Sequence, residues 1–346
     1  MRWSASARPA SGGDVTPTNH PTAPALQVET VADLVRRVGG ARSDGESRRW
    51  ASGYEPLDDV LGGGFRPGEL TLVGGRPGVG KTVAALQWAR NTARAGRPVL
   101  YVCYEHEPVD LIGRLLALEL GSLARADEIA EVTRLCHLTQ EMTLGAVPIH
   151  RLTSEPLGEE AYGHLRRYGQ LLRIVGSTTA RVGIREIADL VGTESSIVFV
   201  DYLQKVALPH ATSDELDRTT RIAESLKELA MQFDVPVVAL AAANREGLTA
   251  RRMRMHHLRG STALAYEPDV VILMNEKCVA VSKAHLAYDP VRAERYRNQV
   301  VFSVEKNRSG PAPVDLEFNK DFASFRFDPS GAILVEKLVD DVLYEK

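Results

Sequence analysis

The sequence is poor in cysteine, in aromatic residues, in long apolar runs and in net charge. Its 346 residues include 3 cysteines and 6% aromatic residues, and the formal net charge is −3. The cysteines form no CxxC pair and no metal-ligand spacing, which argues against a disulfide or zinc scaffold and favours a reducing cytoplasm. No apolar run approaches the roughly 20 residues of a membrane helix, and the N-terminus lacks the apolar core of a secretory signal. The small net charge argues against a protein that coats nucleic acid by bulk attraction, so such contact needs a local patch.

Composition divides the chain into a tail, a linker and one large domain. Residues 1–27 are rich in Ser, Ala, Pro, Thr and Gly, which predicts a disordered tail. Residues 28–49 contain a short amphipathic helix followed by a polar linker. Residues 50–330 predict a single α/β domain with a helical insert at about 121–170, and 331–346 form a C-terminal tail.

Within the large domain, apolar strands alternate with amphipathic helices. Continuous apolar strands are typical of a parallel sheet that is covered on both faces. Near the C-terminus, two strands at 300–305 and 314–318 flank a Ser-Gly-Pro turn and predict an antiparallel hairpin. We therefore expect an α/β fold, with a mostly parallel sheet flanked by helices and a C-terminal hairpin. The other predicted strands are 69–73, 98–104, 196–200, 235–240 and 270–274, and the main predicted helices are 81–95, 109–120 and 215–233.

The strongest motif is a glycine-rich segment between an apolar strand and a helix, which matches GxxxxGK[ST]. Its glycines let backbone N–H groups surround a β-phosphate, and the helix N-terminus adds a favourable dipole. Lys81 supplies positive charge to the β- and γ-phosphate oxygens, and Thr82 a hydroxyl ligand for Mg²⁺. The alternative is a glycine-rich turn without a ligand, which the four matched positions disfavour. The predicted site for ATP and Mg²⁺ comprises Gly75, Arg76, Pro77, Gly78, Val79, Gly80, Lys81 and Thr82.

Two carboxylates at strand ends fit the chemistry of such a site. Asp201 ends an apolar strand and fits the acid that holds Mg²⁺ through its water shell. In isolation a turn-capping residue would be the default interpretation, which the preceding P-loop disfavours. Glu105 ends the second strand, and we favour it as the base that polarises the attacking water. Glu107 competes for that role, but its place directly before a proline fits a helix start. His106, between them, is interpreted as an exposed histidine because no second histidine lies near.

These segments resemble the C-terminal ATPase domain of DnaB-type replicative helicases, within the RecA-like P-loop NTPases. The segment DYLQ at 201–204 is similar to that family's Walker B strand end. The segment KNRSGP at 306–311 is similar to its KxRxG element. The resemblance covers about residues 50–328, and these two elements favour the DnaB type over RadA-like or KaiC-like relatives.

The resemblance implies a homo-oligomeric ring, usually a hexamer, that binds ATP between subunits and serves DNA replication. Lys306 and Arg308 would then act on the γ-phosphate of the neighbouring subunit as an arginine finger. Without the P-loop they would be interpreted as two solvated charges beside a turn. The linker helix is similar to one that docks on the adjacent subunit.

A basic segment at 244–260 is the predicted contact with single-stranded DNA. It holds five arginines and one glutamate, a net charge of +4, and follows a strand as a mobile loop that several subunits would present to one channel. The alternative is a solvated or protein-contacting loop, because no aromatic residue is interleaved for base stacking. The candidate DNA contacts are Arg245, Arg251, Arg252 and Arg254.

The sequence departs from the family at the position of a polar sensor, typically glutamine. Ala242 stands there, and a methyl group cannot sense a phosphate by hydrogen bonding. The polar stretch 1–49 also cannot replace the helical N-terminal domain that recruits primase in replicative members. We therefore carry two hypotheses: a DnaB-like DNA-translocating helicase, and a RecA- or KaiC-like assembly or regulatory module without unwinding activity. A protein loader or client is an expected partner in either case.

Overall fold

A computed structural model describes residues 30–32, 35–36, 48–125, 127–176, 182–192, 196–208, 214–260, 263–281 and 294–339. The chain separates into two units, Met1–Ser47 and Arg48–Lys346. In the first unit, the described residues of the predicted linker helix 29–38 are helical except Thr30. The predicted tail 1–27 lies outside the described residues.

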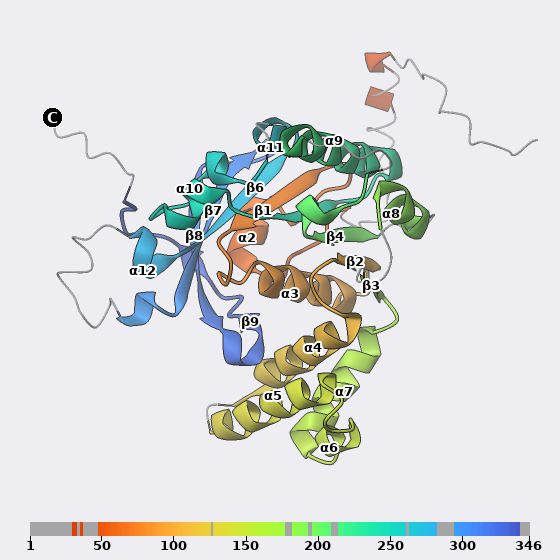
Figure 1. The fold of residues 1–346 in the computed structure, drawn as a ribbon, viewed down its shortest axis with the longest axis vertical. Helices are drawn as coiled ribbons and strands as arrows, with labels where there is room; N and C mark the ends of the chain where they lie inside the picture. Colours follow the sequence, from red (N-terminus) through yellow and green to blue (C-terminus); the bar gives the residue numbers. More distant parts are fainter. Residues whose placement is uncertain are drawn as a thin grey trace, which may run out of the picture. The chain divides into compact units, whose positions relative to one another are not determined.

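A sheet forms the body of the second unit (Figure 1), and its strands are β1 (Leu70–Gly75), β2 (Val99–Cys103), β3 (Leu172–Gly176), β4 (Ile197–Asp201), β5 (Val237–Ala241), β6 (Val270–Glu276), β7 (Gln299–Asn307), β8 (Val314–Asp321), β9 (Arg326–Phe327) and β10 (Ala332–Ile333). In the described part of the chain their order is β10-β8-β7-β6-β1-β5-β4-β2-β3, and β9 pairs with β8. The neighbours from β6 to β3 are parallel. The strands from β7 onward pair antiparallel. The predicted fold class is confirmed, including the C-terminal hairpin.

Helices cover both faces of the sheet, and the main ones are α3 (Lys81–Arg94), α4 (Pro108–Leu123), α7 (Pro156–Tyr168), α8 (Ile184–Val191) and α9 (Glu215–Phe233). Because side chains alternate along a strand, each strand contributes side chains to two hydrophobic cores, one on each face of the sheet. Tyr101 and Phe199 pack in the core that includes α3, α4 and α7. Leu100 and Val198 pack in the core that includes α8 and α9. The shorter helices are α2 (Glu55–Val60), α5 (Ile129–Thr143), α6 (His150–Thr153), α10 (Arg245–Thr249), α11 (Ala263–Tyr266) and α12 (Lys277–Ala280).

A buried ion pair fixes α3 against α4. Arg90 on α3 donates from Nε and Nη2 to the two carboxylate oxygens of Glu119 on α4, at 2.6 and 2.7 Å. The Glu119 side chain has no exposed surface, so its charge depends on this bidentate partner. The pair holds the helix that begins at Lys81 in a set position relative to the helix that follows Glu105.

The chain beyond residue 330 is part of the domain rather than a free tail, as far as it is described. Residues 332–333 add β10 to β8. Leu338 is 2% exposed and packs in a small apolar cluster with residues of α12 and β7. The insert at about 121–170 forms α5, α6 and α7; α5 and α7 contact α4, and α6 contacts both α5 and α7. Among the described helices, none combines the length and apolar character needed to cross a membrane.

The carboxyl edge of the parallel strands positions the glycine-rich loop. The loop runs from β1 to α3, and two of its glycines have positive φ, Gly78 at 80° and Gly80 at 102°. A Cβ atom on Gly80 would lie 2.6 Å from the Phe322 ring. Glycine at that position is therefore required by both the backbone angle and the close contact.

Candidate nucleotide-binding site

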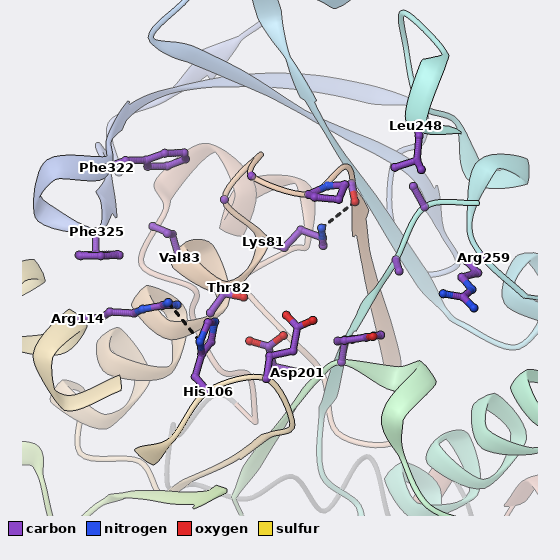
Figure 2. A pocket seen from close by; sticks show the side chains of 18 residues that line it. Lys81, Thr82, Val83, His106, Arg114, Asp201, Leu248, Arg259, Phe322 and Phe325 are labelled. Atoms are coloured by element: carbon purple, nitrogen blue, oxygen red, sulfur yellow. Dashed lines mark hydrogen bonds between the residues drawn. The ribbon is translucent and has the colours of Figure 1, made fainter. Parts of the chain in front are cut away.

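A cavity of about 600 Å³ lies beside the glycine-rich loop. The ends of β1, β2, β4 and β5 contribute to it, together with the turn that follows β8 (Figure 2). This is the edge at which open α/β sheets bind their ligands. The predicted site residues that line the cavity are Gly75, Pro77, Gly78, Gly80, Lys81, Thr82, Glu105 and Asp201.

Lys81 is held by the loop itself. Its Nζ donates to the backbone oxygens of Gly75 and Arg76, at 2.7 and 2.9 Å. Burial lowers the pKa of Lys81, while the nearby carboxylates of Asp201 and Glu105 act in the opposite direction. The ammonium group is thus held by two backbone oxygens of the loop, close to the two acids.

Asp201 is the buried acid of the site. It is 2% exposed, and its carboxylate accepts hydrogen bonds from Thr82 and from the Tyr101 hydroxyl, the latter at 3.0 Å. Burial raises the pKa of Asp201 to about 6, against the effect of these two hydrogen bonds. A desolvated carboxylate beside a threonine hydroxyl is a pair of hard oxygen ligands of the kind that Mg²⁺ prefers.

Glu105 and Glu107 take different places. Glu105 lines the cavity, whereas Glu107 is the residue directly before α4. His106 also lines the cavity and is half-buried, not exposed as expected. Its Nδ1 lies 3.4 Å from Arg114 Nη2, and burial and the Arg114 charge lower its pKa.

In the described residues, no group of three His, Cys, Asp or Glu side chains forms a candidate metal cluster.

An aromatic wall on one side of the cavity was not predicted from the sequence. Phe322 and Phe325, in the turn after β8, line it on the same side as Val83 and Arg114 (Figure 2). The Arg114 guanidinium lies 5.3 Å from the Phe325 ring centre, a cation–π arrangement. Three phenylalanines within six residues after the hairpin were the available signal, but only the folded sheet brings that turn to the loop.

Lys306 and Arg308 lie away from this cavity in their own chain. Lys306 pairs in register with Val271, near the amino end of β6, while the loop follows the carboxyl end of β1. Lys306 Nζ donates to the backbone oxygens of Ala265 and Tyr266, at 2.9 and 2.8 Å. Arg308 Nη2 donates to the same Tyr266 oxygen at 2.6 Å. Both cations are therefore held at the amino ends of the parallel strands, opposite the glycine-rich loop.

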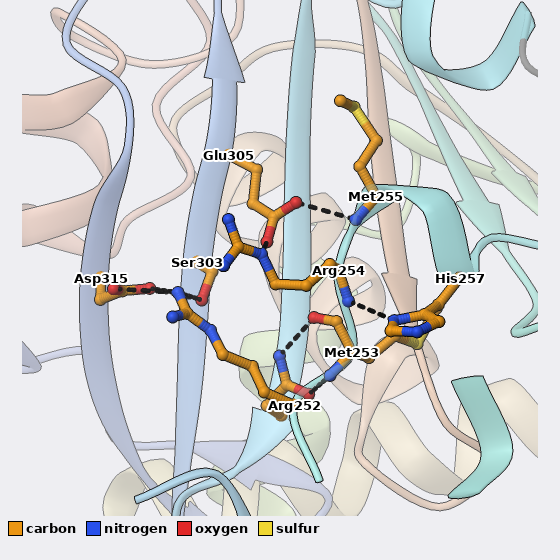
Figure 3. A network of polar contacts seen from close by, with 9 residues as sticks. Arg252, Met253, Arg254, Met255, His257, Ser303, Glu305 and Asp315 are labelled. Atoms are coloured by element: carbon orange, nitrogen blue, oxygen red, sulfur yellow. Dashed lines mark hydrogen bonds and ion pairs between the residues drawn. The ribbon is translucent and has the colours of Figure 1, made fainter. Parts of the chain in front are cut away.

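The basic segment 244–260 is folded onto the sheet, and one predicted DNA contact in it is wrong. Arg252 is 7% exposed, and its Nη2 donates to both carboxylate oxygens of Asp315, at 2.9 and 3.1 Å (Figure 3). A buried guanidinium with a carboxylate partner cannot face a nucleic acid. Arg254 forms an ion pair with Glu305. The expected open loop is instead made of α10, a turn at Met255–His257 and a bridge between Ala243 and Leu258.

Two residues of the predicted DNA contact keep more accessible positions. Arg245 is exposed at the start of α10. Arg251 is exposed and donates from Nη2 to the Val281 oxygen at 3.1 Å. Ala242, at the position of the missing polar sensor, lines the cavity, and its N–H donates to Gln204 Oε1 at 3.2 Å.

The strand, glycine-rich loop and helix, with Lys81 and Thr82 opposite a buried strand-terminal acid, define a nucleotide-binding P-loop protein of α/β class. Residues 173–327 match the family described as DnaB-like helicase C terminal domain, and residues 50–132 match the ATPase family described as KaiC. The chain is related to the DnaB-type helicases through their C-terminal ATPase domain, and the predicted resemblance is confirmed.

Individual relatives agree with this assignment. The replicative DNA helicase DnaB of Treponema pallidum is 27% identical over 280 residues, which are 80% of this chain and 55% of that protein. The one of Geobacillus stearothermophilus is 28% identical over 310 residues, 84% of this chain and 61% of that protein. The chain thus matches little more than half the length of these relatives.

Solved structures show the same fold at low sequence identity. The ATPase domain of G40P superposes with a TM-score of 0.64 and 20% identity, covering 86% of this chain and 95% of that one. A DnaB-like replicative helicase, described with its interactions with primase, gives a TM-score of 0.65 and 20% identity, covering 86% of this chain and 67% of that one.

Proposed function

We propose that this chain is the ATPase module of a DnaB-like, DNA-translocating ring helicase. The main observation behind the proposal is that the catalytic groups lie at two opposite ends of the strands of one sheet. Lys81, Thr82, Glu105 and Asp201 line one cavity, while Lys306 and Arg308 are held at the other end of the strands. Such a chain completes its site by head-to-tail contact with a second copy, which generates a closed ring, usually of six subunits in the related family.

Within one subunit, each group has a distinct task. Lys81 binds the β- and γ-phosphate oxygens of ATP, and the loop N–H groups from Gly75 to Thr82 surround the phosphates. Thr82 and Asp201 would hold Mg²⁺, which supplies charge neutralisation on the phosphate oxygens when bound. Glu105 orients the attacking water and accepts its proton. The Phe322 and Phe325 wall offers an apolar, aromatic surface to a nucleobase.

The neighbouring subunit supplies the remaining charge. Lys306 and Arg308 are oriented by their hydrogen bonds to the Tyr266 backbone oxygen. They would contact the γ-phosphate that is bound by the next subunit. Cations aimed at phosphate oxygens stabilise the charge of the transition state in phosphoryl transfer. Hydrolysis then depends on ring formation.

Single-stranded DNA is the proposed polymer in the channel of the ring. Arg245 and Arg251 are the exposed candidates for phosphate contact, and Arg254 is a weaker one because Glu305 already neutralises it. The second candidate function is an ATP-dependent assembly or regulatory module that acts on a protein client. Two observations favour it: Ala242 puts a methyl group at the sensor position, and Arg252 is withdrawn from the surface.

The decisive experiment is ATP hydrolysis with and without a single-stranded oligonucleotide at two salt concentrations, followed by strand displacement on a forked duplex. We expect stimulation by DNA that weakens as salt rises, because phosphate contacts release counterions. Lys81→Ala serves as the inactive control. An ATP hydrolysis rate that does not change with DNA, together with no strand displacement, would favour the assembly module instead.

A further inference from the structure

A second cavity, of about 250 Å³, adjoins the glycine-rich loop on a different side from the nucleotide site. Pro77 and Gly78 line both cavities, so the loop forms a wall that the two share. The second cavity is otherwise lined by the end of β6, by α12 and by two arginines, Arg76 and Arg251. One arginine comes from the loop itself and the other from the basic segment.

These two arginines differ from three other arginines of the basic segment. Arg76 Nε donates to the Gly247 oxygen at 3.1 Å, and Arg251 Nη2 donates to the Val281 oxygen at 3.1 Å. Both bonds are to neutral carbonyl groups. Across the described ranges, no carboxylate lies within ion-pair distance of either guanidinium. By contrast, three arginines of the same segment have carboxylate partners: Arg252, Arg254 and Arg259.

The charge of the second cavity is positive. Glu276 is the carboxylate that lines it, and its Oε1 lies 3.4 Å from Lys320 Nζ, so its charge is already shared. A guanidinium carries five N–H donors in a planar fork and matches phosphate oxygens well. Two such groups with most donors unused favour an anion with several oxygens.

We propose that Arg76 and Arg251 together bind one phosphate group of a single-stranded nucleic acid in this cavity. The inference rests on the proposed function and extends it, because it places the polymer against the outer wall of the ATP-binding loop. Arg76 already joins that loop to α10 through the Gly247 oxygen. A phosphate bound there would couple the strand to the loop directly, without the polar side chain that Ala242 lacks.

The test is binding of a fluorescein-labelled oligothymidylate, followed by anisotropy over a range of salt concentrations with a non-hydrolysable ATP analogue present. Arg251→Ala should lower affinity about tenfold at low salt and reduce the salt slope by roughly 0.7, the value for one phosphate on a single strand. Arg251→Lys should recover part of the affinity. Arg221→Ala, which removes an exposed arginine on α9, is the matched control and should bind like the parent protein.

The double variant Arg76→Ala, Arg251→Ala decides whether the two groups share a phosphate. Sharing predicts a slope reduction that stays near 0.7, whereas separate phosphates predict roughly 1.4 and would overturn the inference. Parent-like binding by Arg251→Ala would also overturn it, while leaving the proposed function intact. Failure of the parent protein to bind the strand would overturn the proposed function. Calorimetric binding of pyrophosphate that Arg251→Ala abolishes would then assign the cavity to a free phosphate anion and contradict the nucleic-acid ligand.

Discussion

Arg308 and Asp269 are joined at both backbone and side chain. Arg308 Nη1 lies 3.5 Å from Asp269 Oδ1, and the Arg308 N–H donates to the Asp269 backbone oxygen at 2.9 Å. Asp269 is buried, and its Oδ2 accepts from the Leu70 N–H and from Lys227 Nζ, both at 2.8 Å. Leu70 begins β1, the strand that leads into the glycine-rich loop. One carboxylate therefore connects the proposed trans-acting cation with the strand that carries the chain's own P-loop.

Asp269→Asn should lower kcat about tenfold and leave the KM for ATP within about twofold. The reason is that Arg308 loses the charge that orients it, while the cavity residues of the same chain are untouched. Steady-state ATP hydrolysis measures both constants. Thermal melting must accompany them, because Lys227 also loses its partner.

Two further variants separate positioning from a general loss of structure. Lys227→Met removes the other cation from Asp269 but leaves Arg308 paired, and it should keep most of kcat. If Asp269 acts through Arg308, the double variant Asp269→Asn, Arg308→Lys should be little slower than Arg308→Lys alone. A double variant whose loss of kcat equals the product of the two single losses would contradict a positioning role.

Mixing two inactive variants tests the shared site directly. Lys81→Ala should abolish nucleotide binding and hydrolysis, and Arg308→Ala should abolish hydrolysis while nucleotide binding stays nearly intact. An equal mixture should recover about a quarter of the parent rate, because about one interface in four then joins an intact loop to an intact arginine. The rate is measured after subunit exchange, and ring formation is checked by light scattering. Rings that form but stay inactive would contradict a site made by two subunits.

The raised pKa of Asp201 predicts how stability depends on pH. Its value of about 6 in the folded protein exceeds the ordinary 3.8, so the folded state holds this proton more tightly than the unfolded state does. Ionisation therefore costs the folded state stability as pH rises from about 4 to 6, by up to about 3 kcal/mol without Mg²⁺. Asp201→Asn should flatten this fall and be more stable than the parent at pH 7, although it loses hydrolysis.

Urea unfolding at pH 4, 5, 6 and 7 in the presence of a chelator measures this effect. Other carboxylates also titrate in this range, so the quantity to compare is the difference between parent and variant at each pH. Asp59→Asn, at an exposed position of α2, is the control for a change of charge alone. Parallel curves for the parent and Asp201→Asn would refute the assignment.

The sheet and the P-loop were predictable because their signals are local. The strands at 69–73 and 196–200 are continuous apolar runs, as buried parallel strands require, and the structure places them within one or two residues of the predicted bounds. The loop needs glycines at fixed spacing because of its own backbone angles, so its motif can be recognised from the sequence alone. β3 was not predicted, since Arg173 interrupts its apolar residues and only its first residue is buried at the sheet edge.

What the sequence could not provide are partners that are distant along the chain. Arg252 looks like a surface arginine in a basic run, and its partner Asp315 lies 63 residues away on β8. Phe322 and Phe325 likewise reach the cavity only because the C-terminal hairpin turns back toward the glycine-rich loop. Such pairings follow from the order of strands in the sheet, which no short motif encodes.

Ala242→Gln tests whether the missing sensor limits coupling. Ala242 lines the nucleotide cavity, so a glutamine there would place an amide within reach of a phosphate, and an amide can both donate and accept hydrogen bonds. We expect the ratio of DNA-stimulated to unstimulated hydrolysis to rise severalfold. Ala250→Gln, just after α10, adds the same side chain away from the cavity and should leave the ratio unchanged. An unchanged ratio in Ala242→Gln as well would mean that coupling in this chain does not pass through position 242, and would leave the Arg76 contact to α10 as the stronger route.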